Sequence, residues 1–146
     1  MLTPDLITSY KNESLAEEAF KGLRLRKGVV CKKCGGRQHY WLASKKQFQC
    51  KKCRFRTTLQ SGTVLQGSKL PFSYFFIGLH MIMQEKKRIN MEEFQKQTGH
   101  KYFDPLWDFV HKLKHFVDDT GVETLEKDFK EVVETYFTRA HGSSTD

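Results

Sequence analysis

The 146-residue chain has no acidic residue between Glu18 and Glu85. That stretch carries 14 of the 25 lysines and arginines, while the remaining segments hold all 17 acidic residues. The net charge of +8 is therefore concentrated in one part of the chain. A one-sided positive field of this kind favours a polyanionic partner. A basic face that is merely solvated is the alternative.

Long apolar runs are missing as well: the chain has no stretch of about 18 apolar residues, the length that is needed to span a membrane. The start of the chain lacks the basic and apolar regions of a signal peptide. We therefore expect an intracellular, cytoplasmic protein without a membrane partner. Cysteine is scarce, and in a reducing compartment the four cysteines of this chain favour thiolates over disulfides.

The four cysteines form two Cys-x-x-Cys pairs separated by fifteen residues: Cys31, Cys34, Cys50 and Cys53. Each pair can present two thiolates to one point, and a tetrahedral Zn²⁺ takes four such ligands at about 2.3 Å. Fifteen residues suffice for a hairpin between the pairs, which predicts a zinc ribbon. With four protein ligands the site would be closed and structural. A redox pair would need a βαβ context that this pattern does not offer, and an iron–sulfur cluster is the remaining alternative.

Hydrophobic periodicity predicts helices at 13–23, 72–87, 90–99 and 104–119, and short strands at 38–43, 46–50 and 54–59. Segment 122–137 is typical of a helix or a strand, and the polar end 138–146 of a disordered tail.

Particular residues predict where the helices begin and end. Asn12 and Asn90 are suited to N-caps, and Gly99 is suited to stop a helix. Asp104 is the predicted cap of the following helix, with Pro105 at its first helical position.

The predicted helices at 90–99 and 104–119, with a glycine in the turn, are typical of a helix-turn-helix. In that motif the second helix lies in the major groove of DNA. Two helices that simply pack together are the alternative. The candidate DNA contacts here are Lys101, Tyr102, His111, Lys112 and Lys114. Those in the cysteine-bearing segment are Arg37, Lys45, Lys46, Arg54 and Arg56.

Residues 3–117 resemble the front half of a group of bacterial insertion-sequence transposases. The likeness rests on three segments: LRLRKGVVCKKCGG, HYWLASKKQFQCKKCRFRTTLQSGTVLQGSKLPFSYFF and GHKYFDPLWDFVHKLK. Such proteins begin with a zinc ribbon and a helix-turn-helix that bind transposon-end DNA. They continue into an RNase H-like nuclease domain of the Asp-Asp-Glu type. Segment 131–137 resembles the first acidic strand of that domain, with Val133 where the resemblance implies a metal-binding Asp.

Together these observations predict a small α+β fold: a zinc ribbon of short antiparallel β-hairpins packed with a mainly α-helical helix-turn-helix region. The expected segments are an N-terminal helical part at 1–27, the zinc ribbon at 28–68, the helix-turn-helix-like part at 69–117 and an acidic C-terminal part at 118–146.

The predicted function is zinc-dependent binding of double-stranded DNA by a truncated transposase. We expect no enzymatic activity, because the catalytic carboxylates are missing, and an association with the bacterial nucleoid when DNA is bound. A homodimer would suit palindromic DNA. The alternatives are a protein–protein interaction module and a DNA-binding subunit that works with a separate nuclease chain.

Overall fold

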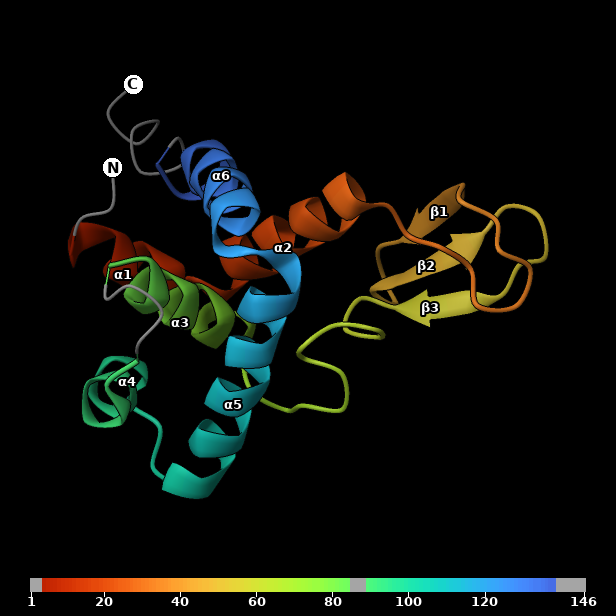
Figure 1. Cartoon of the computed structure of the whole chain (residues 1–146). Coiled ribbons are helices and arrows are strands. Elements are labelled where there is room, and N and C mark those ends of the chain that lie inside the picture. The colour runs from red at the N-terminus through yellow and green to blue at the C-terminus, as the bar shows by residue number, and fades with distance from the viewer. Residues whose placement is uncertain (1–3, 85–88, 139–146) are drawn as a thin grey trace. The chain divides into compact units, whose positions relative to one another are not determined.

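The computed structural model describes residues 4–84 and 89–138 (Figure 1). Its elements follow one another in this order: α1 (Pro4–Tyr10), α2 (Glu13–Lys27), β1 (His39–Leu42), β2 (Gln47–Cys50), β3 (Arg56–Thr58), α3 (Phe72–Gln84), α4 (Met91–Thr98), α5 (Phe103–Thr120), α6 (Val122–Val132) and the π-helix η1 (Val133–Thr138). Helices with one antiparallel sheet confirm the predicted α+β class. The chain forms two compact units: the ribbon unit, Lys21–Lys69, and the helical unit, Met1–Phe20 with Leu70–Asp146.

The ribbon unit is built on a three-stranded antiparallel sheet in which β2 lies between β1 and β3 (Figure 1). The end of α2 covers one face of this sheet. There the Arg24 guanidinium donates to the carbonyl oxygens of Thr58 and Leu59, each at 2.9 Å. It also lies 5.5 Å from the ring centroid of Phe48, which is buried. Arg24 therefore serves the fold of the ribbon unit.

In the helical unit, α3 is the central element. Its residues from Ser73 to Ile82 are all buried, as its uniformly apolar sequence predicts. The Glu13 carboxylate at the start of α2 caps α3, because it accepts from the N–H groups of Phe72 at 2.7 Å and Ser73 at 3.1 Å.

A buried polar pair joins α1 to α3 within an aromatic cluster. The Tyr10 hydroxyl lies 2.9 Å from Nδ1 of His80, and both side chains are fully buried. The rings of Phe76, Phe129 and Phe137 surround Tyr10 at centroid distances between 4.9 and 6.3 Å. Helix α1 lies within the N-terminal part expected to be helical, although periodicity predicts a helix only at 13–23, and this long-range contact joins it to α3.

The predicted helix ends agree with the structure in three places and differ in one. The N–H of Leu15 donates to Asn12 Oδ1 at 3.2 Å, and that of Glu93 donates to Asn90 Oδ1 at 3.1 Å. Gly99 ends α4 in the left-handed conformation. The cap predicted at Asp104 is wrong: α5 begins two residues earlier, at Phe103, and its N-cap residue Tyr102 makes no capping side-chain bond.

The C-terminal segment is helical in the structure, since α6 runs directly into η1. The strand implied at 131–137 by resemblance is therefore absent from this described part of the chain. Residues 85–87 of the helix predicted at 72–87 lie outside the described residues. So does the predicted tail, except for Thr138. Among the helices that the structure describes, none is both long and apolar enough to cross a membrane.

Candidate metal centre

Two turns with the same hydrogen bonds hold the four cysteines. The N–H of Gly35 donates to the carbonyl of Cys31, and the N–H of Arg54 to that of Cys50, each at 2.9 Å. In each turn the N–H of the first cysteine donates to a carbonyl five residues later, also at 2.9 Å. Gly35 and Arg54 both have left-handed backbones, with φ of 77° and 65°. The repeated Cys-Lys-Lys-Cys sequence thus folds twice into the same turn.

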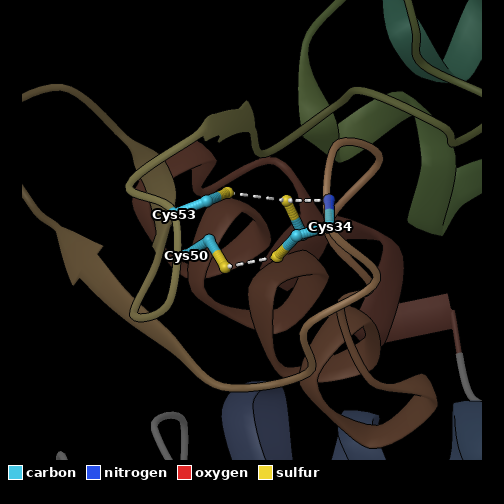
Figure 2. Close-up of side chains that lie close together, drawn as sticks. Cys34, Cys50 and Cys53 are labelled. Carbon is cyan, nitrogen blue, oxygen red and sulfur yellow. Dashed lines mark hydrogen bonds between the residues drawn. The ribbon is translucent and has the colours of Figure 1, made fainter.

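The sulfur atoms of these turns converge, as Figure 2 shows for Cys34, Cys50 and Cys53. Sγ of Cys31 lies 3.5 Å from that of Cys53, and Sγ of Cys34 lies 3.5 Å from that of Cys50. All four sulfurs lie within 4.8 Å of one another, and the cysteines are free thiols. Ligands 2.3 Å from a tetrahedral metal ion would lie about 3.8 Å apart. The donor set and its spacing therefore fit one four-coordinate, thiolate-bound metal ion.

The backbone of the second turn favours the thiolate form that a metal requires. The N–H groups of Cys53 and Lys52 both donate to the Cys50 sulfur. Together they lower the pKa of Cys50 to about 6, and the Cys53 N–H has the larger effect. For Cys31, burial raises the pKa, but the N–H groups of Cys34 and Lys33 outweigh it, so that its pKa is lowered overall. For Cys34, the N–H of Gly36 lowers the pKa, but hydrogen bonds with the Cys50 and Cys53 sulfurs outweigh it and raise the pKa to about 12. Local geometry thus favours the thiolate form of Cys31 and Cys50.

Residues 11–56 match the family model described as the transposase zinc-ribbon domain, of the IS1595 type. The match includes all four cysteines and the sheet up to the start of β3, and it covers less than half of the chain. Comparison with curated proteins and with solved structures gives no match. The resemblance is therefore confirmed for this segment: the chain contains a transposase-type zinc ribbon whose four cysteines lie close enough together to hold a metal ion.

The structure places the basic residues predicted to contact DNA on the surface of the ribbon unit. Arg37 precedes β1, Lys45 and Lys46 form the turn between β1 and β2, and Arg54 and Arg56 lie at and after the second cysteine turn. All five side chains are exposed. Their contact with DNA stays a prediction.

The second predicted set belongs to the helical unit. Lys101 and Tyr102 precede α5, and His111, Lys112 and Lys114 lie along its exposed side. The ring centroid of His111 lies 3.9 Å from that of Trp107, which had not been singled out. The helix-turn-helix interpretation of α4 and α5 also stays a prediction.

A hollow beside the cysteine turns was not foreseen. It has a volume of about 340 Å³. Its lining comes from both turns: Gly36, Arg37, Gln38, Lys51 and Lys52. The cysteine spacing predicts that the two turns share one metal ion, but it does not show that residues in and beside them, such as Lys51 and Lys52, line a hollow.

Proposed function

We propose that the four cysteines hold a Zn²⁺ ion and that the chain is a non-enzymatic, zinc-dependent DNA-binding protein. The observation that carries this proposal is the charge of the ribbon unit: residues 21–69 contain 14 lysines and arginines and no Asp or Glu. Four thiolates with one Zn²⁺ sum to about −2, which leaves the unit strongly positive. Cations on a rigid scaffold bind the phosphates of DNA and release counterions.

In this proposal the metal has a structural role, because four protein ligands leave no open coordination position. Arg37, Lys45, Lys46, Arg54 and Arg56 contact phosphates from the ribbon unit. The exposed side of α5 approaches the major groove in the manner of a recognition helix. The match of residues 11–56 to a transposase zinc ribbon supports the assignment of DNA as the polyanion.

The test is the affinity of the zinc-loaded protein for a fluorescent 30-bp duplex between 50 and 300 mM salt, measured by anisotropy. We expect a steep loss of affinity with salt. Lys45→Ala should lower the log–log slope by about 0.9, the share of one phosphate contact. Lys130→Ala is the matched control, because it removes an exposed positive charge on α6, in the helical unit, where Lys130 pairs with Glu126. Chelation of the metal should weaken binding strongly, because the phosphate contacts of the ribbon unit depend on the metal.

A salt-independent affinity, or an affinity that chelation leaves unchanged, would overturn the proposal. Incubation of the duplex with the protein and Mg²⁺ or Mn²⁺ tests the expected lack of nuclease activity, and any cleavage by the chain alone would contradict it. A separate nuclease chain would add cleavage only in a mixture of the two.

A protein-interaction role is the second candidate, because the start of α5 exposes three large aromatic side chains. Tyr102, Phe103 and Trp107 are 63%, 44% and 48% exposed. Aromatic residues are enriched at protein interfaces. Concentration-dependent dimerisation, measured by light scattering, together with no duplex binding at 50 mM salt would favour this role.

A further inference from the structure

The sheet of the ribbon unit has one covered face and one open face. Trp41, Phe48 and Thr57 are partners in register and belong to the face covered by α2. The neighbouring row of register partners is Tyr40, Gln49 and Arg56, and successive strand residues point to opposite faces. Tyr40 is 55% exposed, and Arg56 is exposed as well. The open face therefore presents an aromatic ring and a guanidinium on one row.

The hollow beside the cysteine turns is connected to this row through Lys51. Its Nζ atom lies 5.0 Å from the ring centroid of Tyr40, and Lys51 also lines the hollow with Arg37 and Lys52. Ligand sites begin at volumes of roughly 300 Å³, so a hollow of about 340 Å³ has room for a phosphate with its sugar. Three residues with cationic side chains line the hollow, so its preferred ligand is an anion.

An aromatic ring beside such a cationic hollow suits a nucleotide. Stacking of a base on an aromatic side chain contributes about 1–3 kcal/mol, as measured by alanine substitution. The faces of bases inside a duplex are already stacked on their neighbours, so they are not accessible to Tyr40. An unpaired base is accessible, and its phosphate can reach the hollow while the base lies on the ring.

We propose that Tyr40, with the hollow formed by Arg37, Lys51 and Lys52, is a binding site for an unpaired DNA nucleotide. This inference rests on the proposed function and adds to it a preference for DNA with a single-stranded segment over fully paired DNA. Tyr40 is a binding residue that stacks on the base, and the three cations hold its phosphate.

The first test compares two fluorescent probes: a blunt 20-bp duplex and the same duplex with a five-nucleotide single-stranded 3′ overhang. We expect the zinc-loaded protein to bind the overhang probe more tightly. Tyr40→Ala should weaken overhang binding roughly 5- to 150-fold and blunt-duplex binding less than about twofold. Tyr40→Phe should retain the preference. Leu25→Ala is the matched control, because Leu25 lies in the same unit and is also 55% exposed.

The outcomes separate this inference from the proposed function. If the blunt duplex binds and the overhang adds nothing, or if Tyr40→Ala weakens both probes equally, the nucleotide site is wrong and the general DNA binding stands. If only the overhang probe binds, the duplex-binding proposal fails and the nucleotide site stands. If neither probe binds, both are wrong.

A second measurement uses the unmodified protein and so does not depend on the folding of a variant. An overhang that contains 5-iododeoxyuridine is irradiated in the complex, and the cross-linked peptide is identified by mass spectrometry. We expect the cross-link at Tyr40. Cross-links confined to the helical unit would overturn the proposal.

Discussion

Arg54 has a backbone conformation that side chains normally avoid. Its φ is 65°, and the same position of the first cysteine turn is occupied by Gly35 with φ 77°. A left-handed backbone costs a non-glycine residue about 1–2 kcal/mol, which the metal-binding turn must offset. Glycine adopts this conformation freely but has more entropy to lose on folding, about 0.5–1 kcal/mol.

We therefore expect Arg54→Gly to stabilise the ribbon unit by about 0.5–1 kcal/mol and to lower the salt slope of duplex binding by about 0.9. Thermal unfolding of the zinc-loaded protein and anisotropy measure the two effects. Gly35→Ala is the converse control. Apart from the two chain neighbours of Gly35, no residue has an atom within 4 Å of the added Cβ, so the loss of stability expected there is conformational. An Arg54→Gly protein that is less stable than the wild type would contradict this account.

His80 makes the stability of the helical unit depend on pH. Burial lowers its pKa to about 4, while an unfolded histidine has a pKa of about 6.5. Between these values the unfolded chain binds more protons than the folded one. The free energy of unfolding is therefore unaffected by His80 above pH 6.5. As the pH falls towards 4, protonation of His80 in the unfolded chain lowers this free energy by about 3 kcal/mol in total.

Hydrogen exchange of the α3 amides between pH 7 and 4.5, corrected for intrinsic rates, measures this loss. We expect His80→Leu to reduce the pH dependence. His115→Gln, at an exposed position on α5, should leave it unchanged. An NMR titration in which the His80 ring protonates near pH 6.5 in the folded protein would contradict the prediction.

At the scale of elements, the close approach of α3 and α5 depends on Gly78. A Cβ atom added there would lie 2.5 Å from Cδ2 of Leu113 and 3.5 Å from Cε1 of Phe94. Both neighbours are fully buried, so neither can move into solvent. Overpacking of a core lowers the free energy of unfolding by about 1–3 kcal/mol. The higher helix propensity of alanine offsets up to about 1 kcal/mol of this loss.

Gly78→Ala should therefore lower the free energy of unfolding of the helical unit by about 1–2 kcal/mol, as measured by urea denaturation. In a Leu113→Ala background the clash is removed, so the same substitution should be neutral or stabilising. Equal effects of Gly78→Ala in both backgrounds would show that its contact with Leu113 is not the cause.

The elements that could be predicted from sequence are those determined by local chemistry. Asn12, Asn90 and Gly99 act on backbone groups within four residues, and the cysteine spacing encodes two local turns. Helix α1 is only seven residues long and depends on the contact of Tyr10 with His80, 70 positions away. The cysteine spacing brings the two turns together at one metal ion, but the hollow and the open face of the sheet also depend on the strand register, which no local pattern reveals.

At the scale of the whole molecule, the two units differ in what stabilises them. The helical unit has a continuous aromatic and aliphatic core around α3. The ribbon unit has three strands of at most four residues, and a chain segment of this size generally needs a metal or a disulfide to stay folded. Binding of a structural zinc ion supplies about 10–16 kcal/mol at neutral pH. Stability should therefore depend on the metal in one unit only.

We expect chelation of the metal to unfold the ribbon unit and to leave the helical unit folded. The physical reason is that the four thiolates lose the ion that offsets their mutual repulsion, while the core around α3 contains no metal ligand from this site. Hydrogen exchange resolved by peptide measures this directly: protection should disappear in β1–β3 and persist in α3 and α5. Cys53→Ser should reproduce the pattern without a chelator, because it removes one ligand. Loss of protection in both units at the same chelator concentration would show instead that the chain folds as a single cooperative unit held together by its metal.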